Sequence, residues 1–154
     1  MKRVIDNLNE ISFDLPKGWV ISTDKYHLMN GQGFANNENY ISPENKVLSL
    51  FEIQRDPDEF FDSYQNLVEN FNEKQDNLVL AKQFAINVND FSFPVYILKG
   101  TKEEIIYIVQ IFINCGDCLG CFIFNIDNFD DDKKALLSKN KLFKQVGEIL
   151  RTIE

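Results

Sequence analysis

The most apolar part of this chain is residues 103–127, EEIIYIVQIFINCGDCLGCFIFNID, which also holds all three cysteines. Gly116 and Asp117 suit a two-residue turn, so the stretch is predicted to form a β-hairpin with antiparallel strands over residues 105–115 and 118–126. Residues on either side of such a turn lie opposite each other. The predicted cross-strand pairs are Cys115 with Cys118, Phe112 with Cys121, Val109 with Phe124, and Tyr107 with Ile126.

Both faces of this hairpin are apolar. Side chains alternate across a strand, so one face collects only apolar and aromatic residues: Tyr107, Val109, Ile111, Ile113, Cys115, Cys118, Phe122, Phe124 and Ile126. The other face is apolar apart from three amides, and it holds Ile106, Ile108, Gln110, Phe112, Asn114, Leu119, Cys121, Ile123 and Asn125. A hairpin with two apolar faces needs cover on each, which places it centrally in a sheet with helices or loops on both sides.

Length and composition indicate a single globular domain over residues 1–154. With 44% hydrophobic residues, including 14 Phe, the chain holds enough apolar surface to build a core without disulfides or metals. The formal net charge of -8 opposes non-specific binding to phosphate backbones, which requires clustered Lys and Arg. No nucleic-acid partner is therefore expected.

The amino terminus and the cysteines predict a cytoplasmic location. The first residues, MKRVIDN, lack the apolar region of a signal peptide, and no apolar run is long enough to span a membrane. An odd number of cysteines without an export signal indicates a reducing compartment.

The first third of the chain predicts short strands. Residues 11–15 alternate apolar and polar, and the turn residues 16–18, PKG, lead into residues 19–21, so these segments are predicted to form a short hairpin. Residues 24–44 are rich in Asn and Gly and fit either a mobile loop or weak strands. Residues 46–54 alternate in the manner of a half-buried strand.

Two amphipathic helices are predicted. Asp56 is the N-cap of the first, with Pro57 and Glu59 in its first turn, and the helix ends near Phe71. The second is one long helix that follows the acidic run at residues 130–132. Its apolar face holds Leu136, Leu142, Phe143, Val146, Ile149, Leu150 and Ile153.

Between the helices, residues 78–126 predict a meander of four consecutive antiparallel strands. Residues 78–86 form the first strand, with Leu78, Leu80, Phe84 and Ile86 on one face. A turn at residues 87–90 leads to a strand over residues 91–99. Pro94 lacks a backbone donor, which predicts a bulge or an edge position near it.

The three cysteines form C-x2-C-x2-C, the most suggestive pattern for chemistry in the chain. Bacterial ferredoxins combine this spacing with a fourth Cys and a Pro, but Asn125 and Ile126 stand at those positions. In a regular hairpin Cys115 and Cys118 project from one face and Cys121 from the other, so the three cannot share a tetrahedral metal. They are expected to be small buried core residues with no cofactor. A thiol or zinc-binding role for Cys115, Cys118 and Cys121 is the alternative.

No other pattern favours catalysis. A Cys–His nucleophilic pair would need His27, the only histidine, beside a cysteine, and nothing near it in sequence supports that. The acidic residues Asp127, Asp130, Asp131 and Asp132 lack the Gly and the downstream Glu of a calcium loop, and carboxylates in a first helical turn already interact with the helix dipole. The chain also lacks the common hydrolase and phosphate-binding motifs, so we expect it not to be an enzyme.

The opening at residues 13–19, FDLPKGW, together with the order of the predicted elements, resembles the PsbP-like superfamily. That group includes the photosystem II extrinsic P subunit, the Mog-type Ran-binding import factors, the DcrB-type bacterial proteins and the Eag-type chaperones of type VI secretion effectors. Its pattern is an opening like F-x-x-P-x-G-W, a capped helix, an antiparallel meander and a C-terminal helix. The resemblance implies the α+β class, with a three-layer α/β/α sandwich around a mainly antiparallel sheet, and a role in binding other proteins without chemistry.

The expected function is therefore that of a non-enzymatic cytoplasmic protein-binding module, such as a chaperone, an adaptor or a toxin-neutralising partner. The net charge of -8 favours a basic partner. Loops on a rigid scaffold commonly carry recognition, so the predicted contacts lie in or beside the Asn-rich region: Trp19, Tyr26, His27, Phe34 and Tyr40. For Trp19, packing in the core is an equally good interpretation.

Overall fold

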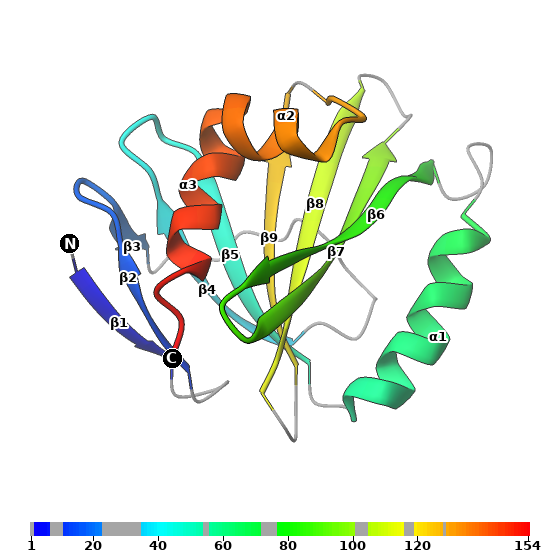
Figure 1. The fold of residues 1–154 in the computed structure, drawn as a ribbon, viewed down its shortest axis with the longest axis horizontal. Helices are drawn as coiled ribbons and strands as arrows, with labels where there is room; N and C mark the ends of the chain where they lie inside the picture. Colours follow the sequence, from blue (N-terminus) through cyan, green and yellow to red (C-terminus); the bar gives the residue numbers. More distant parts are fainter. Residues whose placement is uncertain are drawn as a thin grey trace.

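The computed structural model of this protein describes residues 2–6, 11–22, 35–53, 56–71, 77–100, 105–115, 119–127 and 129–154. Within these residues the elements follow one another along the chain (Figure 1) as β1 Lys2–Asp6, β2 Ile11–Leu15, β3 Val20–Ser22, β4 Ala35–Ile41, β5 Val47–Ile53, α1 Pro57–Glu69, β6 Leu78–Val88, β7 Phe91–Gly100, β8 Ile106–Asn114, β9 Leu119–Ile126, α2 Lys133–Lys139 and α3 Lys141–Leu150.

A seven-stranded sheet forms the centre of the molecule. Its strand order is β3-β4-β5-β9-β8-β7-β6, and every described neighbour pair is antiparallel. β1 and β2 form a separate two-stranded sheet. The predicted α+β class with a mainly antiparallel sheet is confirmed. Within the described ranges, no helix combines the length and the apolar character that crossing a membrane requires.

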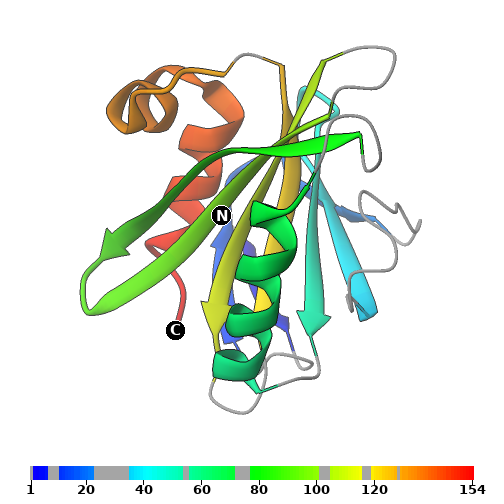
Figure 2. The same ribbon diagram turned by 90° about the vertical axis from the view of Figure 1, so that its right-hand side faces the viewer.

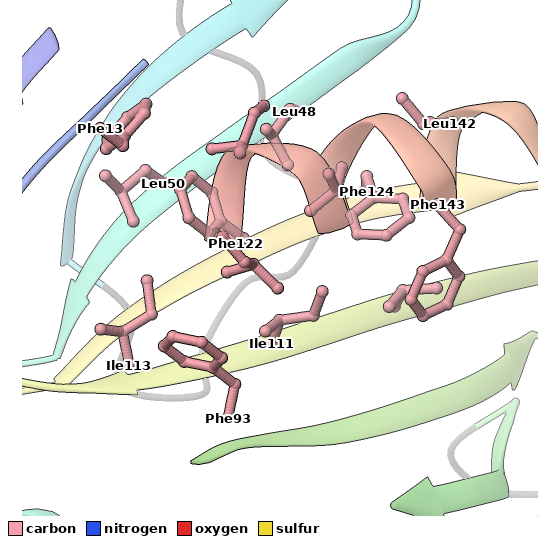
Figure 3. Packing of buried hydrophobic residues seen from close by; sticks show 14 of the residues in the cluster. Phe13, Leu48, Leu50, Phe93, Ile111, Ile113, Phe122, Phe124, Leu142 and Phe143 are labelled. Carbon is pink, nitrogen blue, oxygen red and sulfur yellow. The ribbon is translucent and has the colours of Figure 1, made fainter. Parts of the chain in front are cut away.

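The β8–β9 hairpin lies in the middle of this sheet, as predicted. Phe112 pairs with Cys121, and Val109 pairs with Phe124, in the expected register. Its apolar faces both lie inside the protein, because β5 and β7 flank the hairpin and other elements cover each face. Figure 3 shows one of these faces, where Ile111, Phe122 and neighbouring apolar side chains pack together.

α1 and α3 pack against opposite faces of the β8–β9 hairpin. On one face, Phe60 and Tyr64 of α1 pack against Phe112, with ring centroids 5.5 and 5.7 Å apart. On the other, Phe143 of α3 packs edge to face on Phe124 at 5.4 Å. Figure 1 shows α1 and α3 on opposite sides of the β8–β9 hairpin, with β1 and β2 next to α3.

A one-residue bulge in β6 changes which of its side chains point to each face of the sheet. Leu80 pairs with Leu98 and Lys82 with Ile97, which leaves Ala81 without a partner in β7. Because one extra residue reverses which side chains face which way, Leu80 joins the cluster under α1, whereas the even-numbered residues beyond the bulge join the cluster under α3. The prediction that Leu78, Leu80, Phe84 and Ile86 share one face is therefore wrong.

Pro94 lies in the part of β7 that pairs with β6 but not with β8, so β7 is an edge strand at this residue. The last β7–β8 pair is Val95 with Ile111, so Pro94 lies just beyond the reach of β8 and still pairs with Ala85 of β6. Since Val88 and Phe91 flank the hairpin turn as a hydrogen-bonded pair, alternation makes Ala85 and Pro94 a non-hydrogen-bonded pair. The missing N–H of Pro94 therefore costs β6 no ladder bond.

The N-terminal strands pair differently from the prediction. Residues 11–15 and 20–22 are strands, but they do not form a hairpin with each other: β2 pairs with β1, and β3 pairs with β4. Of the two interpretations for residues 24–44, the strand holds for β4, and residues 23–34 lie outside the described part of the chain.

β5 is buried along both faces rather than half-buried, because a core cluster packs against each face. Its apolar residues serve both layers of the core. Leu48 and Leu50 face α3, whereas Phe51 and Ile53 face α1.

The C-terminal helix is interrupted. Asn140 has extended backbone dihedrals, and its side-chain oxygen accepts a hydrogen bond from the N–H of Phe143 at 3.0 Å. It therefore ends α2 and caps α3, which corrects the prediction of one long helix. The apolar face is as predicted, because the seven residues assigned to it are all buried.

Candidate functional site

A groove of about 670 Å³ lies between the end of β6 and the helices α2 and α3. We call it the β6–α3 groove, and it is lined by Ile86, Asn87, Val88, Asn89, Lys133, Leu137, Ser138, Lys144, Gly147, Glu148 and Arg151. In Figure 2 the turn end of the β6–β7 hairpin reaches away from the other strands, on the side of the sheet that carries α2 and α3. The volume lies within the range of common ligand-binding clefts.

The groove is cationic, although the protein as a whole is acidic. Among the described residues, its lining holds Lys133, Lys144 and Arg151 against a single carboxylate, Glu148. Lys144 lies in α3 and Arg151 is the C-cap residue of that helix, and their seven-residue spacing places both on the same side of it. Neither forms an ion pair with another described residue. These two cations are consequently available to a bound anion.

Lys133 is already partly engaged. Its ammonium group donates a hydrogen bond to the backbone oxygen of Ala85 and lies 5.5 Å from the centre of the Phe84 ring. Alternation along β6 directs the Ala85 oxygen outward, away from β7. Lys133 therefore satisfies one backbone acceptor at the open edge of β6 and joins α2 to that strand.

Gly147 lines one wall of the groove, and because it has no side chain, nothing projects from α3 into the groove at this position. It lies inside α3, where glycine costs about 1 kcal/mol relative to alanine. A Cβ atom added there would meet no other atom within 4 Å. The packing of the fold therefore does not require glycine at this position, and any larger side chain would project into open space beside the groove.

The predicted contact residues do not form a surface in the described part of the chain. Trp19 is 5% exposed and Tyr40 is fully buried, and both belong to the core cluster under α3. Neither ring is accessible to a partner, so these two predictions are corrected in favour of core packing. Tyr26, His27 and Phe34 lie outside the described residues.

The cysteines lie as the hairpin geometry requires. Cys115 packs at the edge of the cluster under α3, whereas Cys121 is fully buried in the cluster under α1. Cys118 lies outside the described residues. Cys115 and Cys121 project from opposite faces and cannot share a metal ion, and no three His, Cys, Asp or Glu side chains in the described ranges are grouped as metal ligands. The zinc alternative gains no support from this arrangement.

A buried polar pair on the α1 face has a structural explanation. The Tyr64 hydroxyl donates a hydrogen bond of 2.6 Å to the side-chain oxygen of Gln110, and both residues are buried. The Gln110 amide nitrogen has no acceptor among the described residues. Burial raises the pKa of Tyr64, so the hydroxyl keeps its proton and its role as donor. The pair joins α1 to β8 inside the core, away from the groove.

Comparisons with known proteins identify the fold. No family model matches the chain, and no curated protein matches its sequence. Cyanobacterial PsbP (CyanoP) from Synechocystis sp. PCC 6803 matches with a TM-score of 0.60 at 12% identity, over 99% of this chain and 91% of that one. A protein from Bacteroides thetaiotaomicron VPI-5482 matches with a TM-score of 0.55 at 13% identity, over 99% of this chain but 47% of that one. LpqN of Mycobacterium tuberculosis, which is involved in cell envelope biogenesis, has a TM-score of 0.48 at 13% identity, over 93% of this chain and 81% of that one.

This chain therefore has a PsbP-like fold, as the opening FDLPKGW indicated. At such low identity the likeness concerns the fold alone. It supports none of the Mog-type, DcrB-type and Eag-type groups in particular.

The groove was missed in the sequence, although two signals for it are present there. One is a glycine within the amphipathic pattern of α3, and the other is the seven-residue spacing of Lys144 and Arg151. Both describe only α3. The opposite wall comes from β6, more than forty residues earlier in the chain, and its position depends on the whole sheet.

Proposed function

We propose that this protein is a non-catalytic protein-binding module that holds a segment of a partner protein in the β6–α3 groove. The observation that carries the proposal is the open groove itself, with Gly147 on its wall at a position where the fold does not need glycine. An apolar floor beside charged side chains is typical of recognition surfaces. The lining offers cations, amides and apolar groups, with Glu148 as the single carboxylate among the described lining residues.

The PsbP-like resemblance supports a binding role, because it implies proteins that bind other proteins without chemistry. A chaperone, an adaptor and a toxin-neutralising partner all fit this description. The three-layer α/β/α arrangement and a cytoplasmic location remain parts of the proposal. Tyr26, His27 and Phe34 remain predicted as a second contact region, and the net charge of -8 supports a partner with a basic surface outside the groove.

Blocking the groove tests this function. In Gly147→Trp the indole ring would project from α3 into the space where a segment would lie. The matched control is Asn66→Trp, which places the same ring at an exposed position of α1 on the opposite side of the sheet. Tagged full-length variants are expressed in the cells of origin, and captured proteins are quantified by mass spectrometry after circular dichroism has confirmed folding.

We expect the wild type and Asn66→Trp to capture the same defined protein, and Gly147→Trp to capture about tenfold less, as expected when a central contact is lost. Equal capture by Gly147→Trp would contradict the groove as the site. Loss of capture only after replacement of Tyr26, His27 and Phe34 would place the contact in the Asn-rich region. If the folded wild type enriched no protein above a tag-only control, the binding function itself would be wrong.

A further inference from the structure

We infer that the segment held in the β6–α3 groove is acidic and extended, and that it adds to the open edge of β6 as a further strand. This inference rests on the proposed protein-binding function and specifies the chemistry of the partner. It is carried by two independent features of the groove, its charge and the exposed backbone of β6.

The charge of the groove decides between an acidic and a basic occupant. Lys144 and Arg151 face the groove, and in the part of the chain that the structure describes they have no ion-pair partner and Glu148 is the one carboxylate in the lining. The net charge of -8 belongs to the whole surface, and salt screens charges farther apart than about 8 Å at physiological ionic strength. At contact distance the local cations therefore dominate, and they favour carboxylates.

The backbone of β6 favours an extended segment. β6 is the last strand on its side of the described sheet. Alternation from the turn makes Asn87 and Ser92 a non-hydrogen-bonded pair, so the N–H and C=O groups of Asn87 point away from β7. No described residue satisfies these groups. Lys133 covers the neighbouring Ala85 oxygen, which leaves the part of the edge near the turn available for strand addition.

Apolar side chains beside this edge define the pattern of the segment. Ile86, Val88 and Leu137 line the groove, and Phe91 lies opposite Val88 with 49% of its surface exposed. An added strand would present alternate residues to these apolar groups. Its carboxylates would interact with Lys144 and Arg151. A segment that alternates apolar and acidic residues fits both requirements.

Synthetic peptides test the inference directly. The probes are fluorescein-labelled ten-residue peptides that alternate Val with Glu, with matched peptides that alternate Val with Gln or Val with Lys. Binding to the full-length protein is measured by fluorescence anisotropy at fixed ionic strength, and amide chemical shifts locate the binding site. A further Val–Glu peptide carries N-methyl groups on alternate amides, which removes the donors needed for strand addition.

We expect the Val–Glu peptide to bind most tightly and to shift the amides of residues 86–89 and 144–151. The double variant Lys144→Glu, Arg151→Glu should weaken its binding about tenfold, since two exposed ion pairs are lost and charge repulsion replaces them. Lys134→Glu, an exposed lysine of α2 outside the groove lining, is the charge control and should weaken binding less than twofold. N-methylation should abolish binding.

Several results would overturn the inference. Tighter binding of the Val–Lys peptide at the same amides would make the occupant basic, while leaving protein binding at the groove intact. Undiminished binding of the N-methylated peptide would exclude strand addition. Binding of single-stranded DNA or of phosphatidylglycerol vesicles without binding of the Val–Glu peptide would assign the cations to another polyanion. If no peptide binds while partner capture still depends on Gly147, the inference fails and the proposed function stands.

Discussion

The residues that carry the PsbP-like resemblance build a turn and a part of the core. Gly18 has a φ of 90°, which side-chain-bearing residues rarely adopt, and a Cβ atom there would lie 2.8 Å from the Pro43 side chain. Phe13 and Trp19, on either side of this turn, are both buried in the cluster under α3. The motif was recognisable in the sequence because its residues shape the backbone and fill the core, and for the same reason it indicates a fold rather than a binding site.

Three buried ionisable groups under α1 predict a loss of stability in alkaline solution. Burial raises the pKa of Tyr64, Tyr96 and Cys121. In the unfolded chain these groups release protons near pH 10 for Tyr and about 8.5 for Cys. Above these values the unfolded state binds fewer protons than the folded state, so the free energy of unfolding falls as pH rises. Their contribution is fully present below the unfolded-state pKa values.

Urea unfolding between pH 7 and pH 11 checks this prediction. Tyr64→Phe removes one of the three groups, and it also loses the hydrogen bond to Gln110, which lowers stability at every pH. The informative quantity is therefore the slope of the free energy of unfolding against pH. Above pH 10 this free energy should fall less steeply for Tyr64→Phe than for the wild type. Parallel curves for the two proteins would contradict a raised pKa at Tyr64.

The two described thiols should differ sharply in reactivity. Cys115 is half-buried, whereas Cys121 is fully buried and burial raises its pKa, which disfavours the reactive thiolate. In a Cys118→Ser variant, iodoacetamide should modify Cys115 in the native state and Cys121 only in urea. Peptide mapping by mass spectrometry gives the two rates. In the wild type, protection of all three cysteines by added zinc would instead support the metal alternative.

At the scale of elements, local sequence signals predicted those features that depend on neighbouring residues in the chain. The N-cap of α1 is as predicted, since Asp56 accepts hydrogen bonds from the N–H groups of Asp58 and Glu59 at 3.0 and 3.2 Å. The bulge at Ala81 and the break at Asn140 were missed. A bulge depends on the partner strand, and Asn140 interrupts an apolar pattern that continues through both helices. Neither feature changes the composition or the periodicity from which the elements were predicted.

The cap at Asn140 provides a prediction for the break between α2 and α3. Its side-chain oxygen satisfies the N–H of Phe143, a donor that the first turn of α3 otherwise leaves without an intrahelical partner. Asn140→Ala should lower the free energy of unfolding by about 1 kcal/mol. Asn140→Asp keeps an acceptor at the same place and should remain close to the wild type. Denaturant midpoints measure both, and equal stability of the Ala and Asp variants would contradict the capping role.

At the scale of the whole molecule, the sequence predicted the centre of the sheet better than its surroundings. The β8–β9 hairpin lies between β5 and β7 in the middle of the sheet, where α1 and α3 pack on its two apolar faces. The pairing of β2 with β1 and the position of the groove depend on segments that are distant in sequence. The backbone of Glu154 at the carboxyl terminus, for example, exchanges hydrogen bonds of 2.9 and 3.1 Å with Ser12 of β2. No local pattern encodes such contacts, and the β6–α3 groove arises in the same way.

The central claim, that a partner segment lies in the β6–α3 groove, is tested most directly by photo-crosslinking in the cells of origin. A photoreactive amino acid replaces Lys144 in the groove, Tyr26 in the Asn-rich region, or Asn66 on the far side of the sheet. We predict that position 144 crosslinks to one defined protein through an acidic segment and that position 66 crosslinks to none. Crosslinks to that protein from position 26 or position 66, with none from position 144, would contradict the claim.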